Sequence, residues 1–336
     1  MRSGFNSSVS LCRVIGMLMI VFCHIGTAVG SSAIGQMFQS GVHLFLFISG
    51  FLYSNKKIDD ARKWMYGRIL RVSVPCYIWV LFMCLTGLLM QQAVPLVTLV
   101  LSVLNLQGIH FLFTFLPSPT IISGVSHLWF ITAMMLCYVL TVLIKKWETT
   151  GRCAVGLKFL AITLVLTFLV GVVGVRCDYL WIYFAGYAAG KTAKRIDLKK
   201  YVLLTVVMVV SVAGRLLMKR YCDANGDNNI YLYVVIPVAY MAMALWIFYT
   251  VDLVNKKFGL MEKLQPTVVG KLIDSLDAIS FYVYITHYAF TDAPFSVMAL
   301  TGNLAVNLMI LMVLTLATSL ALKAITGWVL KCLPYG

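Results

Sequence analysis

Long apolar runs separated by short polar segments are the feature that most limits what this chain can fold into. A helix needs about 20 apolar residues to cross the hydrocarbon core of a bilayer, and the run from Leu304 to Leu322 contains no charged residue. Similar runs recur along all 336 residues, which are 61% hydrophobic and only 12% charged. Because about a quarter of the residues in a soluble domain are charged, the chain is expected to be a polytopic membrane protein.

The runs do not alternate between apolar and polar residues, as the strands of a membrane barrel would. They therefore predict an all-α protein, because a helix satisfies its own backbone hydrogen bonds inside the bilayer. About ten transmembrane helices are expected, without a soluble domain, so that residues 1–336 form one integral membrane domain. The expected spans are 9–29, 38–54, 72–92, 127–144, 158–175, 179–191, 201–218, 231–250, 276–292 and 303–329.

Basic residues determine the expected orientation, since Lys and Arg gather in cytoplasmic loops. Segments 55–71 and 145–158 are both rich in them, which predicts that both lie in the cytoplasm. Two spans already connect these loops, so the apolar segment 93–126 is expected to stay outside or to enter the membrane as a re-entrant piece. Both termini are then cytoplasmic. The expected location is the inner membrane of a bacterium, with membrane lipids as partners.

The net charge of +15 is concentrated in these short clusters and does not form a basic face interleaved with aromatic residues. Nucleic-acid binding is therefore not expected. None of the nine cysteines has the spacing of a zinc site, so no metal is expected either. Cys177 and Cys222 both fall near expected outer loops. They could pair, although two unrelated thiols is the simpler interpretation.

The stretch RVIGMLMIVFCH places Arg13 and His24 in the first expected span. Eleven residues of helix rise about 16 Å in about three turns, so the two side chains lie on nearly the same face. Each has an ordinary explanation, because Arg13 can reach the headgroups and His24 can pack against a backbone group. Together they suit a long ligand with an anionic head and a reactive tail, such as coenzyme A with its pantetheine arm.

The expected topology also places these arginines and the histidines on opposite sides of the membrane. Arg13, Arg68 and Arg71 map to the inner edge of the membrane. All five histidines map to its outer half or to the outer segment, and they are His24, His43, His110, His127 and His287.

Four further motifs follow Arg13 and His24 along the chain: LFLFISGFLYS at 44–54, YGRILRVSVPCYIW at 66–79, SHLWFI at 126–131 and FYVYITH at 281–287. In order and spacing the set resembles the membrane acyltransferase-3 family. That family has Arg and His eleven positions apart in its first span, a Ser-Gly-Phe second span, Arg-x-x-Arg at the third, a His-Leu-Trp segment and a late Tyr-x-x-x-His. Two features depart from it: no Asp precedes Arg13, and His43 stands where a hydrophobic or acidic residue is expected.

The resemblance implies an O-acyltransferase that moves an acyl group, usually acetyl from acetyl-CoA, to a hydroxyl of a sugar. Its acceptors would be cell-surface or lipid-linked glycans, of the O-antigen, capsule or exopolysaccharide type. Arg13, Arg68 and Arg71 would bind the phosphates of coenzyme A, for which the planar guanidinium is well suited. Arg68 and Arg71 could also be ordinary positive-inside charges.

A thioester is an activated acyl donor, so the reaction requires neither a metal nor ATP. It requires a group that removes the proton of the acceptor hydroxyl, and His24 is the expected general base. A double displacement through acyl-His24 or the thiol of Cys23 is the alternative.

By resemblance, three residues are candidate donors to the oxyanion of the intermediate: Ser49, Trp129 and Tyr284. Each of them could equally be a packing residue. His127 and His287 are candidates for orienting His24, holding the sugar or capping a helix.

Two other classes of protein stay open. Intramembrane Arg and His also suit a proton-coupled transporter or exporter of a glycan or small molecule, although no inverted repeat is visible. A non-catalytic scaffold of polysaccharide assembly is the third class. Turnover of acetyl-CoA by the purified protein separates the enzyme from both.

Overall fold

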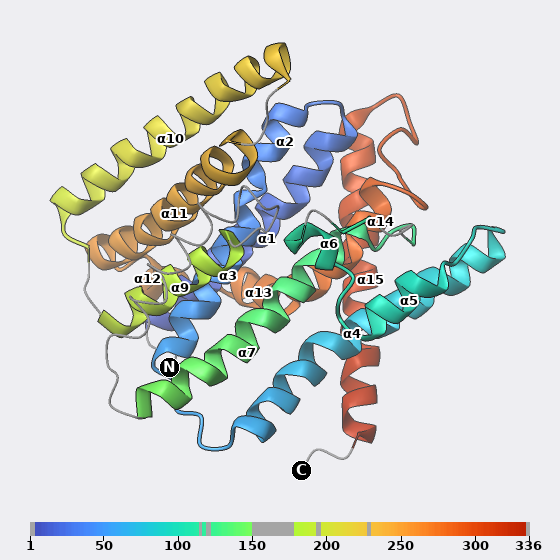
Figure 1. Cartoon of the computed structure of the whole chain (residues 1–336), viewed down its shortest axis with the longest axis horizontal. Coiled ribbons are helices and arrows are strands. Elements are labelled where there is room, and N and C mark those ends of the chain that lie inside the picture. The colour runs from blue at the N-terminus through green and yellow to red at the C-terminus, as the bar shows by residue number, and fades with distance from the viewer. Residues whose placement is uncertain are drawn as a thin grey trace.

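The computed structural model describes residues 4–113, 116–118, 122–149, 178–192, 196–226 and 230–333. Within these ranges the chain is helical and has no strand, which confirms the predicted all-α class (Figure 1). The elements are α1 (Gly4–Ala28), α2 (Ser32–Phe38), α3 (Ser40–Ser54), α4 (Ala61–Leu89), α5 (Leu96–Val103), α6 (Ile109–Leu112), η1 (Ser126–Leu128), α7 (Trp129–Thr149), α9 (Asp178–Thr192), α10 (Leu198–Asn225), η2 (Tyr231–Val235), α11 (Ile236–Phe258), α12 (Leu260–Leu264), α13 (Val268–Thr286), α14 (Tyr288–Thr291) and α15 (Leu304–Cys332).

Seven helical segments of the described chain are long and apolar enough to cross a bilayer: Ser8–Ala28, Gly35–Ser54, Ala61–Leu89, Ser126–Glu148, Leu198–Asn225, Ile236–Phe258 and Leu304–Cys332. The protein is therefore a multi-pass membrane protein. Two of the three other expected spans, 179–191 and 276–292, overlap α9 and α13, and the third, 158–175, lies outside the described residues. The number ten and the orientation stay predictions.

Helix α4 begins eleven residues before the span expected at 72–92. Asp60 caps it, because its carboxylate accepts a hydrogen bond from the backbone N–H of Lys63 at 2.9 Å. The prediction of a loop across 55–71 is therefore wrong from Ala61 onward. Its physical reason is that polar first turns, which lie beyond the apolar part of a helix, still form helix when a cap satisfies their free N–H groups. Arg68 and Arg71 lie inside α4 and not at its start.

Helix α5 folds back along α4 and does not cross on its own. The hydroxyl of Tyr77 donates to the carbonyl of Val103 at 2.6 Å, and the amide of Asn105 donates to that hydroxyl at 2.9 Å. Tyr77 is about 18 Å before the end of α4, so α5 returns well along the length of that helix. Both alternatives for segment 93–126, outside or re-entrant, stay predictions.

Close helix packing fixes the centre of the bundle. A Cβ at Gly50 of α3 would lie 1.9 Å from the carbonyl oxygen of Tyr183 in α9, and one at Gly186 would lie 2.0 Å from that of Phe47. Only glycine allows such contact between helix backbones. Figure 1 shows α10 at one edge of the bundle, beside α11, and α4 with α5 at the opposite edge.

Candidate active site

Three histidines that are far apart in the sequence lie together in the structure. They are His24 on α1, His127 in η1 and His287 between α13 and α14. The ring centroids of His24 and His287 are 5.1 Å apart, those of His127 and His287 are 5.3 Å apart, and those of His24 and His127 are 6.2 Å apart. Of the predicted site residues, the fold thus brings His24 next to both His127 and His287, which were candidates for orienting it, holding the sugar or capping a helix.

Backbone carbonyls determine which ring nitrogen of His127 and of His287 carries a proton. Nε2 of His127 is 3.1 Å from the carbonyl oxygen of Ile285, and Nδ1 of His287 is 2.9 Å from the carbonyls of Val283 and Tyr284. A carbonyl only accepts, so these nitrogens donate. The opposite nitrogens, Nδ1 of His127 and Nε2 of His287, are buried and have no hydrogen-bond partner among the described residues. Each neutral ring therefore keeps one lone pair for a ligand or substrate.

A small cavity, which we name the histidine cavity, joins this cluster to other predicted site residues. Its lining is Ile20, Cys23, His24, Gln39, Val42, His127, Trp129 and Tyr284. Its volume of about 50 Å³ is far below the several hundred cubic ångström of a pocket that encloses a whole ligand. In this arrangement it has room for reacting atoms but not for a sugar ring.

Two contacts shape the wall of the histidine cavity. The hydroxyl of Tyr284 donates to the carbonyl of His127 at 2.5 Å, so its single proton holds η1 in place. Tyr284 is therefore not free to donate to an oxyanion in this arrangement. Gly108 lies against the start of α7, where a Cβ would be 2.3 Å from the carbonyl oxygen of Trp129.

The sequence analysis missed Tyr288, although it directly follows the FYVYITH motif. Its ring stacks on that of His127 at 4.8 Å and meets that of His24 edge-on at 4.7 Å. Its hydroxyl donates to Asp292 Oδ2 at 2.6 Å. The position after the motif histidine was the available signal, because a residue next to a site residue at a helix break also faces the site.

Arg13 has an acidic partner on a distant helix. Its Nε and NH2 groups contact the two carboxylate oxygens of Asp277 on α13, both at 2.6 Å. The side chain of Asp277 is only 7% exposed, against 35% for Arg13. The acidic partner of Arg13 thus comes from α13, 264 positions later in the chain, and not from the residues just before it.

Two contacts join α1 to α13: the ion pair between Arg13 and Asp277, and the ring contact between His24 and His287. Arg13 lies eleven residues before His24, and Asp277 lies ten residues before His287, so both intervals correspond to about 15–16 Å of helix. The two helices therefore run parallel and in register. The pair between Arg13 and Asp277 fixes this register, and with it the position of His24 beside His287.

Arg68 and Arg71 line a second pocket, of about 370 Å³, at the N-terminal end of α4. We name it the basic pocket. Its full lining is Lys57, Ile58, Asp59, Asp60, Lys63, Trp64, Gly67, Arg68 and Arg71. Four cations face two carboxylates, one of which, that of Asp60, is already used to cap α4. The pocket is therefore suited to an anion.

Aromatic rings hold one of these arginines. The guanidinium of Arg68 lies 5.4 Å from the ring centre of Tyr53 and 5.7 Å from that of Trp64, and it donates to the Tyr53 hydroxyl at 3.1 Å. Partial burial lowers the pKa of the neighbouring Lys56, and the positive charges of Arg68 and Arg71 lower it further. The electrostatic potential of the basic pocket is therefore positive, and the planar ring of Trp64 lies beside Arg68.

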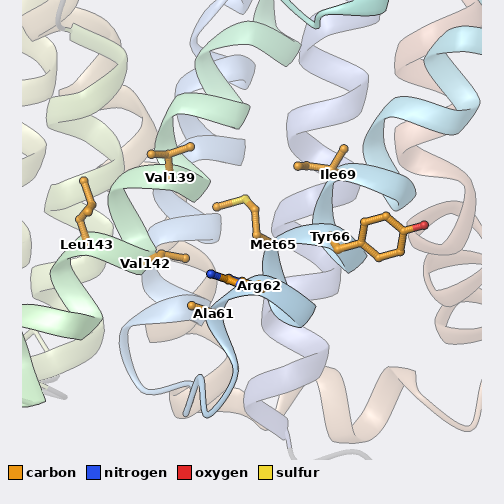
Figure 2. A pocket seen from close by; sticks show the side chains of 8 residues that line it. All are labelled: Ala61, Arg62, Met65, Tyr66, Ile69, Val139, Val142 and Leu143. Carbon is orange, nitrogen blue, oxygen red and sulfur yellow. The ribbon is translucent and has the colours of Figure 1, made fainter. Parts of the chain in front are cut away.

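A third and larger cleft, of about 520 Å³, lies between α4 and α7. Figure 2 shows its lining, with Val139, Val142 and Leu143 on α7 facing Arg62 and Met65 on α4; Ala61, Tyr66 and Ile69 complete it. It contains none of the predicted site residues. Its walls are almost entirely apolar and several are exposed, so it is suited to lipid chains and not to the chemistry.

Arg13, which was expected to bind the phosphates of coenzyme A with Arg68 and Arg71, lines none of these pockets. Two further predicted features also stay apart from them. Ser49, a half-buried residue of α3, lines neither the histidine cavity nor the basic pocket. Cys177 lies outside the described residues, so its pairing with Cys222, which is buried on α10, stays a hypothesis. In the described part of the chain, no group of three His, Cys, Asp or Glu is arranged to hold a metal ion.

Comparison with known proteins identifies one family. Neither the curated proteins nor the solved structures give a match. A family model described as an acyltransferase domain matches residues 6–324, nearly the whole chain. The matched range includes the residues of both contacts between α1 and α13, and every lining residue of the basic pocket and of the histidine cavity. The chain therefore belongs to the acyltransferase-3 family and is a membrane-bound acyltransferase.

Proposed function

We propose that this acyltransferase moves an acetyl group from acetyl-CoA to a hydroxyl of a cell-surface or lipid-linked glycan, in the inner membrane of a bacterium. One observation carries the proposal. The two pockets lie near opposite ends of α3: Val42 lines the histidine cavity, and Tyr53 contacts Arg68, which lines the basic pocket. Eleven helical residues separate them by about 16 Å, which is comparable to the pantetheine arm that joins the phosphates of coenzyme A to its thioester.

The basic pocket is suited to the head of the donor. Guanidinium groups bind phosphate through their planar fork, and Arg68 and Arg71 supply two of them. The ring of Trp64 offers a surface on which an adenine base can stack. With the head held there, the arm extends along α3 and delivers the thioester to His24.

His24 then acts as the general base. It takes the proton of the acceptor hydroxyl as the oxygen attacks the thioester carbonyl carbon, which forms a C–O bond and a tetrahedral oxyanion. Collapse of the intermediate breaks the C–S bond, and the proton on His24 passes to the leaving thiolate. The products are the acetyl ester and coenzyme A. Trp129 is the remaining donor candidate in the cavity wall for the oxyanion.

The alternative route forms a covalent acyl-enzyme first. The thiol of Cys23 lines the same cavity as His24, so either group could accept the acetyl before the sugar does. Incubation with radiolabelled acetyl-CoA without acceptor separates the routes. Labelled protein that transfers its label to a later-added glycan indicates the acyl-enzyme, whereas label that stays on coenzyme A indicates direct transfer.

The test of the function is turnover of the thioester by the purified protein in lipid nanodiscs. We expect release of free coenzyme A thiol and acetyl ester on the glycan, both dependent on added glycan. A transporter or a scaffold would release no thiol under these conditions, and that result would overturn the proposal.

Sidedness is tested in sealed vesicles of known orientation. Coenzyme A carries several phosphate charges, which the bilayer strongly opposes, so only its neutral arm would enter the membrane. We expect product with acetyl-CoA on the cytoplasmic side and glycan on the other. If both must be on the cytoplasmic side, threading of the donor is wrong, while acylation of inner-leaflet lipid-linked sugars survives.

A further inference from the structure

Helix α10 carries one buried cation, Arg215. This helix lies at the edge of the bundle (Figure 1), and the residues of it that are buried are Arg215 and Cys222. Arg215 is only 3% exposed. A buried charge on a helix whose side chains are mostly exposed is costly, and such residues in membrane proteins mark sites of function.

No carboxylate among the described residues neutralises this cation. Arg215 NH2 donates to the side-chain oxygen of Gln36 at 3.1 Å, and its guanidinium lies 5.0 Å from the ring centre of Tyr240. Its Nε is buried and has no hydrogen-bond partner in the described part of the chain. The buried carboxylate of Asp178 contacts His43 instead, at 3.6 Å. The guanidinium therefore keeps both a charge and a donor for an anion.

A chain of contacts connects Arg215 to the histidine cavity. The hydroxyl of Tyr240 contacts the backbone oxygen of Gln36 at 2.6 Å and the side-chain oxygen of Gln39 at 3.0 Å. Gln39 lines the histidine cavity, as does Cys23. Arg215 is thus connected through Gln36 and Tyr240 to Gln39 in the wall of the cavity, near the end of α3 opposite to the basic pocket.

We propose that Arg215, with Gln36, Gln39 and Tyr240, forms a subsite for an anionic group of the acceptor. The acceptor would then be an acidic glycan, whose carboxylate or phosphate pairs with Arg215 while a nearby hydroxyl reaches His24. This inference rests on the proposed acetyl transfer and adds the class of acceptor to it. A neutral contact of α10 with Gln36 would not require a charge, because an amide or hydroxyl side chain makes it without desolvating a cation.

The experiment compares acceptors that differ only in charge. Purified protein in nanodiscs is given acetyl-CoA and pairs of oligosaccharides, each an acidic chain and its carboxyl-reduced counterpart. We expect kcat/KM to be at least tenfold higher for the acidic member. In Arg215→Gln this ratio falls at least tenfold, and Arg215→Lys keeps part of it. The matched control is Arg220→Gln, which removes the same charge from an exposed position of the same helix.

The wild-type protein alone also tests the subsite, should Arg215→Gln fail to fold. Glucuronate and glucose 1-phosphate are added as inhibitors, and they should compete with the acidic acceptor and not with acetyl-CoA. The stronger of the two identifies the carboxylate or the phosphate as the recognised group. Glucose at the same concentration and ionic strength is the neutral control.

The outcomes separate this inference from the function on which it rests. Thiol release with equal kcat/KM for acidic and neutral acceptors overturns the subsite and leaves the acetyltransferase intact. An equal fall for both members of the pair in Arg215→Gln also overturns it, since Arg215 would then only tether α10. Absence of thiol release with every acceptor overturns the proposed function itself.

Discussion

At the scale of single residues, the base is the first group to test. His24→Ala removes the ring that meets His127, His287 and Tyr288, and general-base catalysis contributes about 10²–10⁴-fold to a rate. We expect kcat for acetyl transfer to fall within that range while acetyl-CoA binding is unchanged, because the basic pocket is about 16 Å away. Thiol release and isothermal titration with acetyl-CoA measure the two effects.

The matched control for that substitution is His110→Ala. His110 lies on α6, where its ring contacts Phe111 at 4.2 Å and takes no part in the histidine cavity. This variant should keep wild-type turnover. Near-normal turnover in His24→Ala would instead reduce His24 to a packing residue.

The donor head is the second test at this scale. Arg68→Ala and Arg71→Ala each remove a cation from the basic pocket, and loss of a charged hydrogen bond weakens donor binding by about tenfold to a hundredfold. Arg68→Lys should recover little, because lysine lacks the planar fork and does not stack on Trp64 in the same way. Titration with acetyl-CoA measures the affinity.

The control for the donor site must avoid the pocket itself. Lys57 looks like ordinary surface charge in the sequence, but it lines the basic pocket. Lys199, exposed at the start of α10, is the better choice. An equal loss of affinity in Lys199→Ala would mean that bulk surface charge attracts the donor and that no defined site exists.

The sequence nominated most of the residues that gather at the site, but it did so through motifs and not through physics. His24, His127 and His287 belong to segments more than a hundred positions apart, and no local pattern predicts that they meet. Asp277 and Gln39 carry no motif signal at all, and Tyr288 is indicated only by its position directly after the FYVYITH motif. Their roles depend on tertiary contacts, which only the packing of α1 against α13 and α3 defines.

At the scale of elements, the pair between Arg13 and Asp277 sets the register of α1 on α13. Removal of one partner leaves the other partly buried and unpaired, and we expect a cost of about 1–3 kcal/mol, between the values for exposed and buried pairs. Asp277→Asn should therefore lower the midpoint of thermal unfolding. It should also lower turnover, because His24 moves relative to His287.

Exchange of the two charges tests whether Arg13 acts through this register. The double variant Arg13→Asp with Asp277→Arg should recover stability and turnover relative to either single variant. If stability recovers and acetyl-CoA binding does not, Arg13 also binds the donor, as the sequence analysis expects. If neither recovers, the register argument is wrong. Thermal unfolding and donor titration separate the three results.

The limits of sequence-based prediction for whole elements are visible in α4 and α13. Both begin at a polar cap, Asp60 and Thr267 respectively, several residues before their apolar parts. Hydrophobic periodicity locates the apolar part of a span, whereas a cap and tertiary contacts determine where the helix begins. For α13 the prediction started at 276 and thus omitted the first two turns.

At the scale of the whole molecule, the orientation in the membrane is open to a labelling test. In a background without native cysteines, Ser118→Cys places a thiol in an exposed part of segment 93–126. A maleimide that does not cross membranes should label it in intact cells. Lys199→Cys, on the expected cytoplasmic side, should react only after permeabilisation. Labelling of position 118 from the cytoplasmic side alone would refute the topology.

The peripheral position of α10 has a consequence for how this protein changes over evolutionary time. Most of its side chains, among them Val202, Val206 and Val210, are exposed on the outside of the described bundle, where a membrane protein meets lipid. Because lipid accepts any apolar shape, sequence drift on this helix is nearly free of cost as long as hydrophobicity is kept. A saturation library over α10, selected for turnover on an acidic acceptor, should accept most apolar exchanges. Position 215 should tolerate almost no exchange. A library that varies freely at this position would show that α10 contributes only apolar surface and no acceptor contact.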